Sequence, residues 1–469
     1  MTIADRDHDH ESTGGASLLI LGASGDLAAR LLMPGLGGLL THEPHRRVQL
    51  IGAGTETYTD EEWTERVRTS LASVDASGDA VDDLLARTRY VTADVTRADD
   101  LRGLVEACDD APALYFALPP AITAKACEQL EQVDLPRGTV LGLEKPFGTD
   151  AESAHRLNEQ VRKLVPEEQV HRVDHFLGRA TVLNLLGLRF ANRLIEPMLS
   201  NRDVESIEIV YDEQLGLEDR ARYYDGAGAM VDMIQSHLLQ VLAFLTMDPP
   251  ATIGPVDLRD QKGLLLRAVH LWDDDPVASS RRARYTAGSV DGRELRSYAD
   301  EKGVDPSRGT ETLAEVVVEI ATMRWAGVPI TLRSGKALAS RRREILVTFK
   351  RVAHTPPEFS GGGEPDRLRI CLAPDEMSLE LNVNGPGDPM ELDRASLRTE
   401  FNAGTLTAYG EVLSGLLDGD PTLSVRGDTA EQCWRIVEPM VAAWRDGDVP
   451  LDEYAAGSDG PEGWATSHS

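Results

Sequence analysis

Three short segments contain the residue types that could carry out chemistry: EKPFG at 144–148, RVDHFLGR at 172–179 and SHLLQ at 236–240. His237 is suited to act as a general base, because the unperturbed pKa of histidine, ~6.5, lies near working pH. Asp174 could orient that histidine, since a carboxylate bonded to one ring nitrogen fixes the tautomer and stabilises the imidazolium. Such a pair can take the O–H proton of an alcohol as hydride leaves its carbon.

Each of these residues also has a purely structural interpretation. His237 follows Met233 and Ile234 at helical spacing, on the apolar stripe of a predicted helix, where a histidine can simply be packed in the core. Asp174 could cap the helix that follows it. Lys145 precedes a proline, which restricts its backbone to extended or turn shapes and can aim its side chain. A Lys-Pro after a strand is, however, often only a turn.

A glycine-rich loop, GASGDLA, follows the first buried strand. Gly22 permits a tight turn, Gly25 lets the backbone approach a pyrophosphate, and Ala28 keeps the new helix close to the sheet. The pattern predicts a dinucleotide site at the helix N-terminus. The loop residues predicted to contact the cofactor are Gly22, Ser24, Gly25, Asp26 and Leu27.

The second buried strand ends at Thr55-Glu56, where the adenine ribose of a dinucleotide is normally recognised. An acidic residue there suits a 2′-hydroxyl, whereas a 2′-phosphate requires a cation. Arg30, in the first helix, is the nearest candidate cation in the sequence. Because Glu56 could equally be a solvated residue, the choice between NAD and NADP stays open.

The elements that hold these segments change character along the chain. Over the first 150 residues, short apolar runs alternate with helical spacing, which indicates an α/β fold with a doubly wound parallel sheet. Farther on, strand-like runs mix with two long helical stretches at 179–198 and 227–246, which indicates an α+β domain. Buried strands are predicted at Ser17–Leu21, Val48–Ala53, Tyr90–Ala93, Ala113–Leu118 and Thr139–Leu143.

The length of 469 residues exceeds what one hydrophobic core usually supports, so two domains are expected. We predict a dinucleotide-binding domain at 17–178 and a substrate domain at 179–456. Residues 1–16 and 457–469 are polar or Gly/Ser-rich and are predicted to be disordered tails.

The formal net charge is −30, which repels nucleic acid and anionic membrane surfaces. Neither is therefore expected as a partner. The chain has no run of about 18 apolar residues and no apolar segment near its N-terminus, so neither a membrane span nor a secretory signal is expected. Four cysteines without CxxC spacing are typical of reduced thiols in a cytoplasmic protein. They are Cys108, Cys127, Cys371 and Cys433.

Taken together, these segments resemble glucose-6-phosphate dehydrogenases. The resemblance extends from GASGDLA through RSGKAL at 333–338 to CWRIVEP at 433–439, so it covers nearly the whole chain outside the tails. It implies a Rossmann-like N-terminal domain, an α+β C-terminal domain with a large antiparallel sheet, and a homodimer, or a dimer of dimers, formed through that sheet. The implied reaction oxidises glucose 6-phosphate at C1 to its lactone with NADP or NAD and needs no metal.

The resemblance also assigns roles to individual residues. It makes His237 the base and Asp174 its orienter, and it makes Lys145 a contact of both the sugar and the cofactor. Glu213 and Asp232 are implied to accept hydrogen bonds from sugar hydroxyls, although a solvated helix-face charge is the alternative for each. His175, Arg179 and Lys336 are implied to hold the phosphate.

The chain departs from the family pattern at four positions. Phe176 stands where the family usually has tyrosine, Arg179 replaces a lysine, and Ala373 replaces a glutamine on the sugar side. Thr55 stands where an arginine often grips the 2′-phosphate of NADP, which makes NAD plausible. Arg341 could add positive charge, although a solvated basic turn is the simpler interpretation.

These departures leave two alternative hypotheses for function. The first is a dehydrogenase of a free or differently modified sugar. The second is a non-catalytic paralogue that binds a nucleotide or sugar phosphate. Such paralogues usually lose a core catalytic residue, whereas the candidates His237, Asp174, Lys145 and Asp232 are all present.

Overall fold

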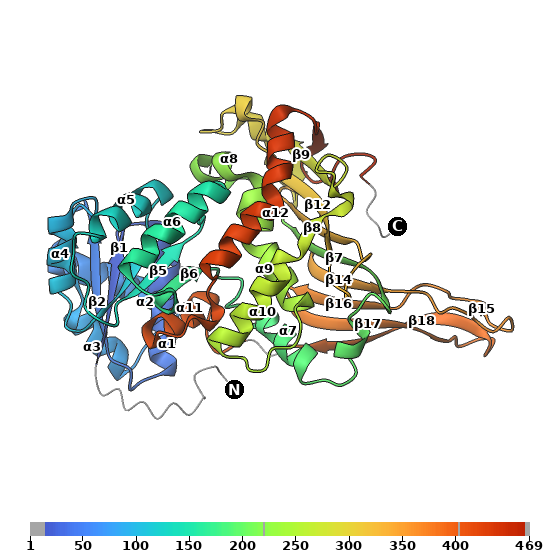
Figure 1. Ribbon diagram of the computed structural model, residues 1–469, viewed down its shortest axis with the longest axis horizontal. Coiled ribbons are helices and arrows are strands. Elements are labelled where there is room, and N and C mark those ends of the chain that lie inside the picture. Colours follow the sequence, from blue (N-terminus) through green and yellow to red (C-terminus); the bar gives the residue numbers. More distant parts are fainter. Residues whose placement is uncertain (1–14, 219–220, 402–403, 465–469) are drawn as a thin grey trace. The chain divides into compact units, whose positions relative to one another are not determined.

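The computed structural model describes residues 15–218, 221–401 and 404–464, which form two compact units (Figure 1). Unit 1 contains the described residues up to 180 together with 250–263 and 404–432, and unit 2 contains the remainder. The two continuous domains predicted at 17–178 and 179–456 differ from this division, because two later segments return to unit 1.

Unit 1 is built on a six-stranded parallel sheet with the order β3-β2-β1-β4-β5-β6. This order is that of a Rossmann-like fold, whose ligand crevice lies at the carboxyl ends of the strands, where the order reverses between β1 and β4. Five of the strands coincide within one or two residues with the predicted apolar runs. The strands are β1 (Ala16–Leu21), β2 (Val48–Gly54), β3 (Arg89–Thr92), β4 (Pro112–Phe116), β5 (Val140–Glu144) and β6 (Val170–Val173).

The helices of unit 1 pack in two groups. Helices α1 to α3 contact one another, and α5 contacts both α4 and α6. Right-handed crossovers between parallel strands place the two groups on opposite faces of the sheet. A π-helical turn (Ala28–Leu32) leads directly into α1. The helices are α1 (Met33–His42), α2 (Asp60–Ala72), α3 (Asp79–Arg87), α4 (Ala98–Glu106), α5 (Pro120–Leu130) and α6 (Ala151–Leu164).

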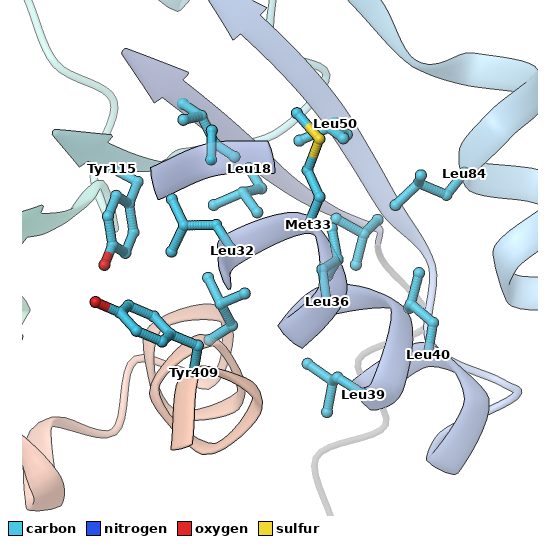
Figure 2. Close-up of a cluster of buried hydrophobic side chains, with 14 of the residues drawn as sticks. Leu18, Leu32, Met33, Leu36, Leu39, Leu40, Leu50, Leu84, Tyr115 and Tyr409 are labelled. Carbon is cyan, nitrogen blue, oxygen red and sulfur yellow. The ribbon is translucent and has the colours of Figure 1, made fainter. Parts of the chain in front are cut away.

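The later segment of unit 1 contributes to its hydrophobic core. Helix α11 (Ala408–Asp418) packs on α1, and its Leu413 and Leu416 are fully buried. Figure 2 shows part of this cluster, in which Tyr409 of α11 lies beside Tyr115 of β4. Local hydrophobic spacing can predict such a helix but not the sheet that it covers, so the sequence interpretation assigned it to the second domain.

Unit 2 contains an 11-stranded sheet with the order β15-β18-β17-β16-β14-β7-β13-β12-β9-β19, and β8 pairs with β12. The predicted large antiparallel sheet is in fact mixed, because the pairs β7–β13, β9–β19 and β15–β18 are parallel. Its strands are β7 (Val204–Asp212), β8 (Val269–Leu271), β9 (Ser280–Thr286), β12 (Leu313–Ile320), β13 (Ile330–Gly335), β14 (Arg343–Phe349), β15 (Ser360–Gly361), β16 (Arg367–Leu372), β17 (Asp375–Asn384), β18 (Glu391–Glu400) and β19 (Leu451–Ala455). A separate hairpin joins β10 (Gly288–Val290) and β11 (Arg293–Leu295).

A central helical stretch crosses unit 2. It consists of α8 (Ala221–Ala229), a π-helix over Met230–Leu238 and α9 (Leu239–Thr246). The part from Tyr223 to Thr246 is long and apolar enough to cross a membrane, but 89% of its most apolar window is buried inside the protein, as in a core helix. The other helices are α7 (Ala180–Phe190), α10 (Pro255–Arg267) and α12 (Gly427–Asp446), and α10 and α12 each run from unit 1 into unit 2.

The end of the chain corrects one sequence prediction. Residues 457–464, predicted to belong to a disordered tail, are packed on unit 2. The Gly457 amide donates to the carbonyl of Ala337 at 2.8 Å, and the Trp464 indole N–H donates to Asp452 at 2.9 Å. Glycine and serine content misled the prediction here because these residues form turns that deliver a tryptophan to the sheet. Residues 465–469, and 1–14 of the predicted N-terminal tail, lie outside the described residues.

Candidate active site

The glycine-rich loop lies at the switch point of the unit 1 sheet. Gly22 has φ +86°, and a Cβ there would collide with the carbonyl oxygen of Ala117 and lie 2.9 Å from a methyl group of Leu118. The amides of Gly22 and Ala23 both donate to the Ala53 carbonyl, at 2.8 and 3.0 Å. Only glycine fits where β1, β2 and the end of β4 meet. The tight turn that glycine permits here is followed at once by a helix N-terminus, an arrangement that suits a dinucleotide pyrophosphate.

At the ribose end of this loop, Ser24 contacts one negative and one positive side chain, Glu56 and Arg66. The Ser24 hydroxyl donates to the Glu56 carboxylate at 2.6 Å, and this bond lowers the pKa of Glu56 below its usual value. Arg66, on α2, donates to the Ser24 carbonyl at 2.6 Å. Thr55 is exposed, as is Arg30, the cation that the sequence suggested. The cation that contacts the loop is therefore Arg66, which sequence reasoning missed because it lies 42 residues from Ser24.

The carboxyl end of β5 presents Glu144 and Lys145. The hydroxyls of Tyr115 and Tyr409 both donate to one carboxylate oxygen of Glu144, the latter at 3.3 Å. Burial raises the pKa of Glu144, while these bonds and the adjacent lysine oppose the rise. The peptide bond between Lys145 and Pro146 is cis. Lys145 is half-buried, so it can reach a ligand at this edge of the sheet.

The carboxyl end of β6 presents the remaining candidates of unit 1. Asp174 is 2% exposed and accepts a hydrogen bond from the Phe176 amide at 2.9 Å, so it shapes a turn and does not cap the next helix, α7, which begins at Ala180. The ring of His175 stacks on Tyr409, with centroids 5.7 Å apart and planes 12° from parallel. The Arg179 guanidinium lies over the Phe176 ring, 4.4 Å from its centroid. Lys145, Asp174, His175 and Arg179 thus share one edge of the sheet with the dinucleotide loop.

The central helix of unit 2 carries Asp232 and His237, which are 3% and 1% exposed. A π-helix closes its hydrogen bonds between residues five apart, and this stretch brings two residues with that spacing onto one face. An ideal α-helix would separate them. The polar side chains buried on this stretch are Asp232, Gln235, Ser236, His237 and Gln240. So many buried polar groups on one apolar helix are typical of a functional site rather than of a single packed core histidine.

Glu311, which lies just before β12, caps the N-terminus of this π-helix. Gly228, with φ +62°, breaks the helical stretch, and the Met230 amide donates to the Glu311 carboxylate at 2.9 Å. A Cβ on Gly228 would collide with the same carboxylate. Burial raises the pKa of Glu311 to about 7 against hydrogen bonds that favour its charge. Glu311 could not be identified from a sequence pattern, because Met230, whose amide it accepts from, lies 81 residues away.

The raised pKa of Glu311 predicts a pH-dependent stability. Since the folded pKa is above the unfolded one, the protonated carboxyl is favoured by folding, and this contribution is present at low pH and lost as pH rises through about 7. The neutral variant Glu311→Gln keeps the acceptor oxygen. It should therefore gain stability relative to the parent chain as pH rises from 5 to 8, by up to about 3 kcal/mol. Urea unfolding at both pH values measures the difference; a pH-independent difference would contradict the prediction. Glu319→Gln, on the strand β12 that follows Glu311, is the control.

The substrate candidates Glu213 and Lys336 lie together in unit 2. Strands β7 and β13 are parallel neighbours, so the residues that follow them meet at one edge. The Lys336 ammonium bonds to the Glu213 carboxylate at 2.8 Å, and Arg343 bonds to its other oxygen at 3.1 Å. Lys336 also lies 5.1 Å from the centroid of the buried Tyr224 ring. The bonds from Lys336 and Arg343 show that the Glu213 carboxylate is not a solvated charge.

Two further sequence candidates occupy less central places. Ala373 lies in the short turn between β16 and β17, and its peptide bond to Pro374 is cis. Arg341 is exposed, as the solvated-turn interpretation has it. Its neighbour Arg343 is the residue of that basic run which contacts Glu213.

Comparison with known proteins matches nearly the whole chain. The family models described as glucose-6-phosphate dehydrogenase, NAD binding domain, and glucose-6-phosphate dehydrogenase, C-terminal domain, match residues 19–184 and 186–467. A glucose-6-phosphate 1-dehydrogenase of Gluconobacter oxydans is 38% identical over 95% of this chain and 94% of its own length. The corresponding protein of Mycolicibacterium smegmatis is 35% identical, over 96% and 94%.

Solved structures give the same result. A glucose-6-phosphate 1-dehydrogenase from Mycobacterium avium superposes with a TM-score of 0.82 at 33% identity, covering 96% of this chain and 95% of that one. A glucose-6-phosphate dehydrogenase in complex with glucose 6-phosphate superposes with a TM-score of 0.85 at 30% identity, covering 96% of both chains.

Proposed function

Because the chain belongs to the glucose-6-phosphate dehydrogenase family, we propose that it oxidises glucose 6-phosphate at C1 to 6-phosphogluconolactone and reduces a nicotinamide nucleotide, the first step of the oxidative pentose phosphate pathway. The observation that carries the assignment is the buried pair Asp232 and His237 on the π-helical stretch, in a chain that matches the family from end to end. The protein is thus an oxidoreductase that acts on a CH–OH group.

His237 takes the proton of the C1 hydroxyl in this mechanism. A nicotinamide nucleotide held by the glycine-rich loop would supply the hydride acceptor. Asp174 orients the imidazole and stabilises its protonated form, and Asp232 and Glu213 accept hydrogen bonds from sugar hydroxyls. Lys145 contacts the sugar near the reacting carbon. The structure supports these roles by burying Asp174, Asp232 and His237, since excluded water strengthens each electrostatic interaction.

Three cations would hold the phosphate group: His175, Arg179 and Lys336. A bidentate arginine suits a phosphate. Lys336 donates a hydrogen bond to Glu213. A substrate that contacts both residues would replace this hydrogen bond with its own contacts. This arrangement keeps a buried lysine paired before the substrate arrives, which avoids the cost of an isolated buried charge.

The phosphate dependence of turnover tests the assignment. Purified protein should reduce the nucleotide with glucose 6-phosphate at a kcat/KM at least about 100-fold above that with glucose, since charged hydrogen bonds to phosphate contribute ~1.5–3 kcal/mol each. Equal efficiency with both sugars would instead favour the dehydrogenase of a free or differently modified sugar, which Phe176 and Ala373 motivate. Absence of any turnover would favour a binding paralogue.

We further propose that NAD is the better cofactor. The Glu56 carboxylate, held at the ribose end by Ser24, would repel a 2′-phosphate and suits a free 2′-hydroxyl. The double variant Thr55→Arg/Glu56→Ser should therefore raise the ratio of kcat/KM for NADP to that for NAD by about 10–100-fold, the value of one charged hydrogen bond. Parallel reduction assays measure the ratio. Arg30→Ala is the control that should leave it unchanged, and a ratio insensitive to the double variant would refute this reading of the site.

Assembly and location belong to the same proposal. By family resemblance the chain forms a homodimer, or a dimer of dimers, through the large sheet of unit 2, and works in the cytoplasm. Sedimentation of the purified protein would test the assembly.

A further inference from the structure

The N-terminus of α11 is held in unit 1 by close backbone contacts on two sides. A Cβ on Gly35 of α1 would lie 3.0 Å from the Gly410 amide nitrogen, and a Cβ on Gly178 would lie 2.6 Å from the carbonyl oxygen of Ala408. The missing side chains let three backbone segments meet. The backbone of Tyr409 is therefore held in place between α1 and the loop that follows His175.

The side chain of Tyr409 joins two parts of the candidate site. Its ring stacks on His175 with planes 12° from parallel, and its hydroxyl donates to Glu144 at 3.3 Å. Figure 2 shows its hydroxyl directed toward that of Tyr115, the second donor to the same carboxylate oxygen. The ring is 8% exposed, so it can take few other positions.

The imidazole of His175 is thereby held by aromatic rings on more than one side. Phe176 contacts it edge-on, with centroids 5.1 Å apart and planes at 63°. Phe176 follows His175 in the chain, whereas Tyr409 comes from α11, a distant segment fixed independently. The stacked ring of Tyr409 therefore adds a constraint that local sequence cannot provide.

We propose that Tyr409 is a positioning residue whose stacked ring fixes the imidazole of His175 for the phosphate of the substrate. The inference rests on the proposed function, because it takes His175 to be a phosphate contact. Tyr409 itself contacts no reacting atom in this proposal. It determines specificity for the phosphorylated sugar rather than the rate of the chemical step.

Two substitutions separate the ring from the hydroxyl. Tyr409→Phe keeps the stacked ring, so the KM for glucose 6-phosphate should stay within about twofold, and Tyr115→Phe should behave alike. Tyr409→Leu removes the stacking, which in aromatic pairs corresponds to a factor of about 3–10, and should raise that KM by this factor with little change in kcat. With free glucose, kcat/KM should be the same for all three variants.

Leu413→Ala is the matched control, because it loosens α11 through a fully buried side chain that is not among the contacts of His175 or Glu144 described above. A general loosening of the helix would make Leu413→Ala reproduce the effect of Tyr409→Leu, and that result would overturn the proposal. An equal loss of efficiency with glucose and glucose 6-phosphate in Tyr409→Leu would overturn it too. If the leucine variant does not fold, Tyr409→Phe replaces it in the test. A tenfold rise of KM in Tyr409→Phe, which keeps the stacked ring, would also overturn the proposal.

His175→Gln distinguishes failure of this inference from failure of the proposed function. If the parent chain depends on the phosphate and His175→Gln raises the KM for glucose 6-phosphate, the proposed role of His175 stands. Tyr409→Leu then tests the positioning role alone. If His175→Gln changes neither substrate's KM, His175 is not a phosphate contact, and both the role given to it and this inference fall.

Discussion

Replacing His237 by asparagine should lower kcat by about 10²–10⁴-fold, the usual contribution of a general base. Asparagine keeps a polar side chain of similar size in a position that is 1% exposed, so the fold should persist. It cannot, however, take a proton from the C1 hydroxyl. Steady-state turnover with glucose 6-phosphate measures the loss, and titration calorimetry should find the sugar phosphate bound with an affinity within about threefold of the parent's.

The neighbouring Ser236→Ala provides the control. The Ser236 hydroxyl returns to the Val231 carbonyl at 2.7 Å, within the helix, so its loss should change kcat by less than about threefold. Near-normal turnover in His237→Asn would sink the assignment of the base. A loss of binding equal to the loss of turnover would show that His237 holds the substrate rather than reacting with it.

The sequence predicted the unit 1 sheet well for a physical reason. Strands buried on both faces, such as β4, are continuous apolar runs, and the turn after β1 needs a glycine with positive φ. Both features are local, so they can be recognised without knowing the rest of the fold. The carboxyl ends of these strands then carry Lys145 and Asp174 to one edge, as parallel strands must.

The helix that carries Asp232 and His237 shows where local reasoning fails. With a period of 3.6 residues, His237 groups with Ile234 and Met233 on an apolar stripe, which favours a packed core histidine. The structure has a π-helix there, so that residues five apart share a face. The π-helix begins at Met230, just after the helical stretch breaks at Gly228, and residue spacing does not encode this restart.

Residues that act across long sequence separations were missed altogether. Arg66 reaches the nucleotide loop, Glu311 caps the central helix and Tyr409 stacks on His175. In each case the residue type is unremarkable in its own segment. Only the sheet order, which decides which distant segments are neighbours, gives it a role.

Replacing Gly228 by alanine should be the most damaging change to the central helix outside its polar residues. A non-glycine residue at φ +62° and ψ −179° occupies a backbone region essentially restricted to glycine, which costs about 1–3 kcal/mol, and the new Cβ would collide with the Glu311 carboxylate. If Glu311 moves away, the Met230 amide loses its cap, which costs a further ~1–2 kcal/mol. Urea unfolding should therefore show a loss of roughly 2–5 kcal/mol in stability. A shift of His237 by about 1 Å should also lower kcat by up to 10²-fold.

Gly226→Ala separates this effect from the general influence of alanine on a helix. Gly226 has no atom within 4 Å of an added Cβ and no positive φ, so alanine there should be neutral or stabilise the protein by about 0.5–1 kcal/mol. The double variant Gly228→Ala/Glu311→Ala removes the collision but not the backbone strain. If the two residues act through their contact, the double variant should be less damaged than the sum of the single variants by about 1 kcal/mol or more. If the losses of stability of the two single variants are strictly additive, the backbone conformation alone requires glycine at 228. The cap by Glu311 would then not depend on the side chain at 228.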